Sequence, residues 1–113
     1  MIYTLEQLRE IIAPIARKYQ IPAVYIFGSY ARGEATEDSD VDVLIDHIGS
    51  RIHGLWDLGA FYNDLNRDLK KEVDIITADS LQQEEVLRST PRLVSSVKRE
   101  RRLIYEKRGY AAH

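Results

Sequence analysis

The sequence predicts a small α+β protein of two layers, in which a mixed sheet of three to four strands packs against helices. Apolar residues recur at helical spacing in segments 5–19 and 55–69. Short apolar runs rich in β-branched residues occupy 23–27, 40–46, 73–76 and 103–105. Amphipathic helices interspersed with short apolar strands are typical of a sheet covered by helices.

Size and composition narrow the possible classes of protein. A length of 113 residues suits a single domain, 1–113. The absence of cysteine excludes disulfides, thiolate nucleophiles and Cys-ligated zinc, so a metal would need oxygen or imidazole ligands. The N-terminus does not resemble a secretory signal, and the longest apolar run is too short to span a bilayer. We therefore expect a cytoplasmic protein without a membrane association.

The first element is expected to be an amphipathic helix that begins at Leu5. Thr4 and Gln7 have the spacing of a capping box, which would close the N-terminus of this helix. Pro14 lies inside the helical pattern, and we expect it to bend or interrupt the helix because it removes one backbone hydrogen bond. The run 23–27 then ends at a glycine, as a buried strand would.

The remaining elements follow in order. Residues 28–39 are small or polar and predict a turn with a short helical piece. Strands at 40–46 and 73–76 would flank a helix over 55–69. Another helix is expected to begin near Asp79 or Ser80, and one more at Thr90, because Pro91 suits a first helical turn. Residues 103–105 would form the fourth strand.

Two aspartates form the first candidate site. In a strand the side chains of Asp40 and Asp42 point to the same face, and two adjacent carboxylates in a cleft usually share a proton or a cation. Mg²⁺ prefers such oxygen ligands. Asp74, on a later predicted strand, would complete the site if the two strands are neighbours. The alternatives are a solvated edge strand for the pair and a hydrated strand end for Asp74.

The glycine-containing loop after the first strand is a candidate phosphate site. A glycine at 28 would let backbone amides approach phosphate oxygens, and Ser29 would add a hydroxyl donor. A Walker A site is excluded because Glu34 and Ala35 occupy the places of the required lysine and serine or threonine. The dinucleotide fingerprint also fails, because Tyr30 stands where it needs glycine. By themselves, Gly28 and Gly33 are better explained by turn geometry.

The loop and the two aspartates together carry a more specific signal. Gly28-Ser29, ten intervening residues and Asp40-Val41-Asp42 resemble the signature of the DNA polymerase beta-like nucleotidyltransferase superfamily. Residues 28–46, GSYARGEATEDSDVDVLID, are similar in particular to the minimal nucleotidyltransferases, which are short domains of about this length. Asp74 in EVDIIT matches the third carboxylate of that family. The strong match covers residues 24–46 and 72–77.

The resemblance implies the polymerase beta-like fold, a chemistry and roles for individual residues. The protein would be a Mg²⁺-dependent nucleotidyltransferase that uses ATP, two Mg²⁺ ions and attack at the α-phosphate, with release of pyrophosphate. The carboxylates of the site, which would bind the metal and catalyse the reaction, are Asp40, Asp42 and Asp74. Asp74 would help to activate the attacking hydroxyl. The residues expected to bind the nucleotide are Gly28, Ser29, Arg32 and Ser39. For Arg32 an alternative is open, namely that it braces the acidic loop through Glu34, Glu37 or Asp38.

A partner is also implied by the resemblance. Minimal nucleotidyltransferases are often antitoxins of HEPN-family ribonuclease toxins, and members of the group can adenylylate a tyrosine of that toxin. We therefore expect AMP transfer to a tyrosine hydroxyl of a HEPN partner. One alternative is a non-catalytic module that neutralises its partner stoichiometrically. Another, a fragment of a small-molecule transferase such as those acting on aminoglycosides, would require an additional acceptor domain. The sequence is also compatible with a homo-oligomer.

Charges and aromatic residues add three further expectations. A net charge of −2 argues against bulk nucleic-acid binding, although residues 98–108 contain six bases and only two acids. This basic segment would steer ATP, bind an acidic partner or simply form a solvated helix face, which is the commonest role of such segments. Aromatic side chains in the segment 55–69 would stack on a base or, more commonly, pack in the core: Trp56, Phe61 and Tyr62. The histidines at 47 and 53 are expected at the surface.

Overall fold

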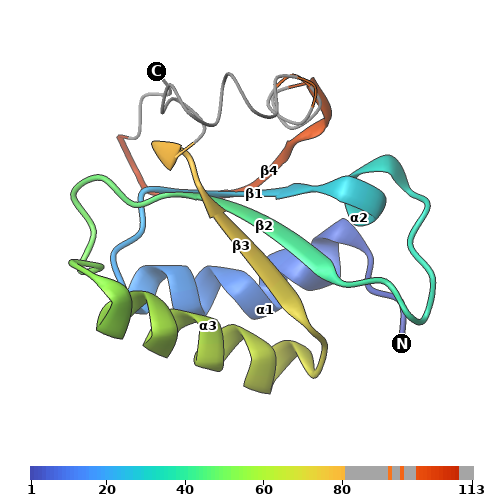
Figure 1. Ribbon diagram of the computed structural model, residues 1–113, viewed down its shortest axis with the longest axis horizontal. Coiled ribbons are helices and arrows are strands. Elements are labelled where there is room, and N and C mark those ends of the chain that lie inside the picture. Colours follow the sequence, from blue (N-terminus) through green and yellow to red (C-terminus); the bar gives the residue numbers. More distant parts are fainter. Residues whose placement is uncertain (81–91, 93–94, 96–98, 110–113) are drawn as a thin grey trace.

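A four-stranded mixed sheet organises the fold (Figure 1). The computed structural model describes residues 1–80, 92, 95 and 99–109. The strands, in the spatial order β3-β2-β1-β4, are β1 Ala23–Phe27, β2 Val41–Asp46, β3 Val73–Thr77 and β4 Arg102–Glu106. β1 pairs antiparallel with β2 and β4, whereas β2 pairs parallel with β3. The predicted α+β class is confirmed, and the segment expected to add a fourth strand forms the edge beside β1.

Three helices accompany the sheet: α1 Leu5–Lys18, α2 Gly28–Arg32 and α3 Leu55–Leu69. α1 and α3 lie next to each other on one face of the sheet, and the short α2 follows directly from the end of β1 (Figure 1). The helices expected after Ser80 and from Thr90 fall on residues outside the described part of the chain. Within that described part, no helix combines the length and apolarity that crossing a membrane requires.

Helix α1 begins at the predicted capping box. The Gln7 amide donates to Oγ1 of Thr4 at 3.1 Å, and the Thr4 amide donates to Oε1 of Gln7 at 2.8 Å. The interruption considered at Pro14 is wrong, because the helix continues through it to Lys18. Pro14 is exposed while Ile12 and Ile15 are buried. The carbonyl that loses its hydrogen bond can therefore be hydrated, and burial of the apolar face outweighs the loss.

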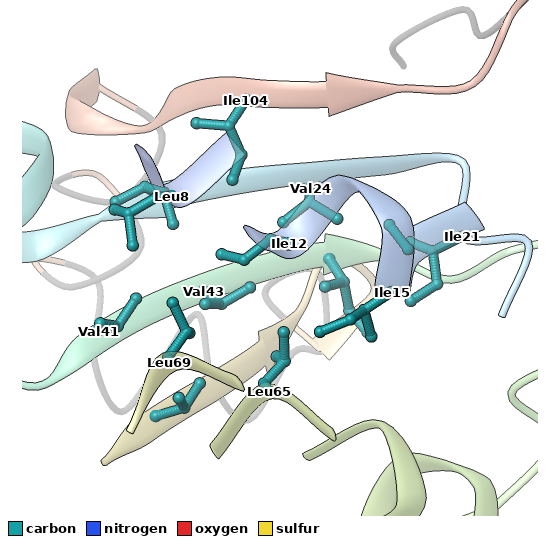
Figure 2. Packing of buried hydrophobic residues seen from close by; sticks show 14 of the residues in the cluster. Leu8, Ile12, Ile15, Ile21, Val24, Val41, Val43, Leu65, Leu69 and Ile104 are labelled. Atoms are coloured by element: carbon teal, nitrogen blue, oxygen red, sulfur yellow. The ribbon is translucent and has the colours of Figure 1, made fainter. Parts of the chain in front are cut away.

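The core lies between the sheet and the helix pair. Figure 2 shows Leu8 and Ile12 of α1 meeting Val24 and Val43 of the sheet, with Leu65 of α3 alongside. The alternate residues of β1 and β2 form a second apolar cluster on the opposite face of the sheet. Its buried members are Ala23, Tyr25, Phe27 and Leu44. The sheet is therefore apolar on both faces, and the aspartates lie on the face that carries this second cluster.

A polar contact fixes α3 against the end of α1. Asp64 in α3 is buried, with its side chain only 11% exposed. It accepts hydrogen bonds from the Tyr19 hydroxyl at 2.7 Å and from Nζ of Lys18 at 3.0 Å. The hydrogen bond from Tyr19 is the main factor that lowers the pKa of Asp64, whereas burial and this bond raise the pKa of Tyr19 to about 12. These charge-assisted hydrogen bonds to the buried Asp64 carboxylate fix the orientation of α3 relative to α1.

The aromatic residues of α3 do not all pack as predicted. Phe61 is fully buried and contacts Tyr19 edge to face, which confirms the expected core role. Tyr62 is partly buried and packs against the core. Trp56 is 94% exposed, so its predicted core packing is wrong. It precedes Phe61 by five residues, which is a rotation of about 140° around the helix and turns it away from the buried stripe.

Substitutions at Phe61 and Trp56 should separate these two environments. Phe61→Ala should lower the free energy of unfolding by about 3–5 kcal/mol, because it leaves a cavity in the core. Trp56→Ala, a matched aromatic truncation in the same helix, should change it by less than about 0.5 kcal/mol. Urea titrations followed by circular dichroism measure both values. A comparable loss in the two variants would contradict the exposure of Trp56.

Candidate active site

The turn from β1 into α2 brings the backbone of Gly28 against the carboxylate of Asp42. Gly28 has φ +71°, and a Cβ at this position would lie 3.1 Å from Cγ of Asp42 and would overlap Oδ2. The neighbouring residue Phe27 pairs with Asp42 across the antiparallel strands. Glycine is required here for two independent reasons, because the left-handed φ is costly for other residues and because no side chain fits. The loop after β1 therefore approaches the Asp42 carboxylate with the backbone of Gly28 and not with a side chain.

Asp42 and Asp74 face each other across the parallel strands β2 and β3. The strand register places them directly opposite, and the two carboxyl groups share a hydrogen bond. Burial is the largest factor that raises the pKa of Asp42 from 3.8 to about 6, and the hydrogen bond and negative charge of Asp74 act in the same direction. Asp42 is half-buried and Asp74 is exposed. One proton or one cation between the two carboxylates would relieve their repulsion.

Asp40 lies just outside this pair. It immediately precedes β2, is exposed, and its negative charge also raises the pKa of Asp42. It lines a pocket of about 450 Å³ together with residues of the acidic loop and of the turn before β3, including Lys70 and Lys71. The sequence prediction that Asp40 and Asp42 belong to one strand is therefore modified, since β2 begins between them at Val41.

The carboxylates of the site could supply part of the coordination shell of Mg²⁺. In the part of the chain that the structure describes, no three carboxylates or histidines converge tightly enough to hold a metal ion alone. Mg²⁺ usually takes one or two carboxylates and completes its shell with water and substrate phosphates. The Asp42 and Asp74 pair, which consists only of oxygen ligands and lies directly opposite across the parallel strands, fits this mode. Asp42 and Asp74 would hold the ion jointly with a nucleotide.

The predicted nucleotide-binding residues have different surroundings. Ser29 lies in the first turn of α2, whose N-terminus has no side-chain cap. Arg32, at the end of α2, donates to Glu34 at 3.0 Å and to Glu100 at 3.1 Å, which supports its bracing role. Oγ of Ser39 accepts from the Thr36 amide at 2.8 Å within the acidic loop. Gly28 therefore contacts Asp42, with Ser29 next to it in the chain, whereas Ser39 bonds within the acidic loop.

Known proteins resemble this chain both in sequence and in fold. The model of the nucleotidyltransferase domain family matches residues 7–104. The chain belongs to the nucleotidyltransferase domain family. It is an enzyme of the minimal nucleotidyltransferase type, and its mixed sheet with three helices is the fold of that family. The glycine, the serine and the three aspartates predicted from the sequence therefore lie in a domain whose family transfers nucleotidyl groups.

Relatives give this family assignment more detail. This chain is 39% identical over 83 residues to one of several Methanocaldococcus jannaschii proteins named putative protein adenylyltransferases. The aligned stretch is 69% of this chain and 82% of that relative. This chain is also 43% identical to protein adenylyltransferase MntA of Thermococcus cleftensis over a shorter stretch of 47 residues. That stretch is 38% of this chain and 48% of MntA.

Solved structures show the same fold. One described as the structure of a putative minimal nucleotidyltransferase superposes with a TM-score of 0.63 at 32% identity, over 88% of this chain and 95% of that one. Another, described as a crystal structure of the toxin-antitoxin with AMP-PNP, superposes with a TM-score of 0.64 at 18% identity, over 88% of this chain and 73% of that one. The second likeness concerns the fold alone.

The surroundings of the site depend on positions far apart in the chain that the sequence does not connect. A solvated helix face is the favoured prediction for the basic segment 98–108, but residues 102–106 form β4 and Glu100 accepts a hydrogen bond from Arg32 of α2. The unequal charge pattern was the available signal. It could not show which element the arginines would approach. The histidine expectations are partly correct, since His53 is exposed while His47 is partly buried and contacts Asp79 at 3.1 Å.

The Gly28→Ala substitution tests the contact with Asp42. The added Cβ would displace the Asp42 carboxylate, so Mg²⁺-dependent ATP affinity measured by calorimetry should fall at least tenfold. Gly33→Ala is the matched control: Gly33 also has a positive φ, +74°, but a Cβ added there would meet no atom of the described residues within 4 Å. Both variants should lose about 1 kcal/mol of stability from the strained φ. Equal loss of ATP affinity in the two would contradict the role of the contact.

The raised pKa of Asp42 predicts a pH-dependent gain of stability on removing its charge. Because the folded-state value of about 6 exceeds the ordinary 3.8, the contribution of Asp42 to stability is present at low pH and is lost as pH rises through 6. In EDTA at pH 8, Asp42→Asn should therefore raise the free energy of unfolding by about 1–2 kcal/mol.

The same Asp42→Asn variant supplies its own control. At pH 3, below the ordinary pKa of 3.8, Asp42 is protonated in the folded and the unfolded state alike, so the substitution should have little effect on the melting temperature. Addition of Mg²⁺ at pH 8 should raise the melting temperature of the unmodified protein more than that of the variant. A variant that is less stable than the parent at pH 8 would contradict the repulsion between Asp42 and Asp74.

Proposed function

We propose that this chain is a Mg²⁺-dependent enzyme that transfers AMP from ATP to a tyrosine hydroxyl of a HEPN-family ribonuclease toxin, and so acts as its antitoxin. The observation that carries the proposal is the contact of the Gly28 backbone with Asp42 beside Asp74. It unites a loop suited to phosphate with a carboxylate pair that needs a cation. The whole chain, 1–113, would act as one catalytic domain.

The chemistry is an in-line displacement at the α-phosphate. The acceptor hydroxyl oxygen forms a bond to the α-phosphorus, the bond to the bridging oxygen of the β-phosphate breaks, and pyrophosphate leaves with the electron pair. Gly28 and Ser29 would orient the phosphates, and Asp74, the exposed member of the pair, would accept the hydroxyl proton. Mg²⁺, when bound by Asp42, Asp74 and Asp40, would supply electrostatic stabilisation of the attacking and leaving oxygens.

The nature of the acceptor is supported by the relatives. Several are named as protein adenylyltransferases, and structural neighbours include toxin-antitoxin complexes, one of them with AMP-PNP. An acceptor on another protein suits the exposure of Asp74 and Asp40, since the attacking hydroxyl must approach from outside. ATP as donor and a ribonuclease as partner would place the reaction in the cytoplasm.

Labelling of the partner tests the proposed function. The protein is incubated with Mg²⁺, ATP labelled at the α-phosphate and a candidate HEPN-family toxin, and the label should move to a tyrosine of that toxin. The double variant Asp40→Asn, Asp42→Asn should reduce the rate at least 100-fold, because the cation ligands lose their charge. Asp68→Asn, an exposed change of the same type in α3, should leave the rate unaltered.

The same variants separate catalysis from stoichiometric binding. If the double asparagine variant still silences the ribonuclease at a one-to-one ratio, binding alone neutralises the toxin and the antitoxin function does not depend on transfer. Equal labelling by the unmodified protein and the double variant would remove the proposed roles of Asp40 and Asp42. Omission of Mg²⁺ with excess EDTA should abolish labelling without unfolding the protein, which circular dichroism can check.

A further inference from the structure

The face of helix α3 that points away from the core carries a row of exposed residues. Spaced four, three and four residues apart, they share one face of the helix over about three turns. The members of this row, which we call the outer stripe, are Trp56, Ala60, Asn63 and Arg67. The opposite face of α3 packs on α1 and β3 and contributes Phe61 and Leu65 to the core. The outer stripe is therefore not needed to close the core of the monomer.

An apolar patch forms the N-terminal end of the outer stripe. Among the described residues, Trp56 and its neighbour Leu55 are the two most exposed large apolar side chains, at 94% and 86%. Burial of such a patch against another surface removes apolar area from water and is favourable. Tryptophan is also among the residue types that contribute most to protein interfaces. The start of α3 is thus suited to contact with another protein surface.

An arginine held by two carboxylates forms the C-terminal end of the outer stripe. Nε of Arg67 lies 3.0 Å from Oδ1 of Asp68, and Nη1 lies 3.2 Å from Oδ1 of Asp64. The Arg67 side chain is nevertheless 66% exposed. Carboxylates bind the edge of a guanidinium group, so its planar faces stay available to an aromatic ring. Arg67 is therefore a fixed cation suited to stacking on an indole ring.

The spacing of the outer stripe reads the same in both directions along the helix. When a second α3 lies antiparallel to the first, a two-fold axis brings Trp56 of each copy opposite Arg67 of the other. The same axis brings Ala60 opposite Asn63, and the short Ala60 side chain lets the two helices approach closely. The antiparallel helix dipoles also attract each other. The outer stripe is thus complementary to a second outer stripe, because it supplies both halves of each contact.

We propose that the outer stripe is a homodimer interface, in which a second copy of this chain packs antiparallel on α3 and each Trp56 stacks on Arg67 of the other copy. This inference goes beyond the proposed function and does not depend on it. Because the interface consists of one helix from each copy, the dimer is expected to be weak, with a dissociation constant on the order of 10–100 µM.

The proposed interface leaves the candidate active sites open. α1 and α3 cover one face of the sheet, and Asp42 lies on the other, because Phe27 of the second apolar cluster pairs with it. Figure 1 shows α3 at the border of the helix layer, with α1 and the sheet on one side of it. A dimer formed through α3 would therefore hold its two carboxylate pairs far from the interface.

Self-association of the unmodified protein is the first test. Sedimentation velocity between about 5 and 500 µM should show a shift from monomer to dimer. Trp56 is the only tryptophan of the chain, so its fluorescence reports on the outer stripe directly. Its quenching by acrylamide should decrease over the same concentration range, because the indole becomes buried. A protein that stays monomeric throughout this range would overturn the proposed interface.

The sign of a charge placed at position 56 tests the pairing with Arg67. Trp56→Lys should weaken dimerisation at least tenfold, because each lysine meets an arginine of the other copy. Trp56→Glu should weaken it at least fivefold less than Trp56→Lys, because an ion pair replaces the stacking. Ile48→Lys, at an exposed apolar residue outside α3, should leave dimerisation within twofold.

The substituted positions are exposed, so all three variants should fold like the parent, which circular dichroism of dilute samples checks. Equal weakening by the lysine and the glutamate at position 56 would overturn the Trp56 and Arg67 pairing, and unchanged dimerisation in both would overturn the interface. Acrylamide quenching that ignores the concentration of this chain but decreases when a candidate toxin is added would assign the outer stripe to the toxin and overturn the homodimer.

Discussion

The contact between the Gly28 backbone and the Asp42 carboxylate is the constraint on which the site depends. The contact is possible only if β1 ends beside Asp42 of β2. The antiparallel register, in which the last residue of β1, Phe27, pairs with Asp42, meets this requirement. The positive φ of Gly28 then turns the chain into α2 without a side chain that would intervene. As a result, the loop, the carboxylates and the helix meet at one corner of the sheet.

This arrangement costs stability in the absence of ligands. Asp42 is half-buried beside another carboxylate, and burial first and the neighbouring Asp74 second raise its pKa, a penalty that a cation would relieve. The fold compensates elsewhere. The core between the sheet and the α1 and α3 pair is fully apolar at its centre, and Asp64 ties the two helices together with a satisfied, buried charge. A function that needs concentrated negative charge is thus supported by a helix layer on the far face of the sheet.

Most elements of the fold could be predicted because their signals are local. The capping box at Thr4 and the β-branched runs depend on residues close in sequence, and each appears where expected. The errors concern properties set by distant neighbours. The interruption considered at Pro14 does not occur, because burial on either side of it holds the helix together, and Trp56 lies on a helix face that no described residue covers. Periodicity alone does not report which face of a helix finds a partner.

The sequence by itself determined the chemistry: a glycine and a serine, ten residues, two aspartates and a later third one identify the nucleotidyltransferase family. Residue identity and spacing belong to the covalent chain, so they are the same in every conformation. Only the tertiary structure decided that Asp42 meets Asp74 across parallel strands, that Asp40 stays outside this pair, and that the arginines preceding β4 adjoin α2. Strand order creates these neighbours, and strand order depends on long-range packing that no local pattern encodes.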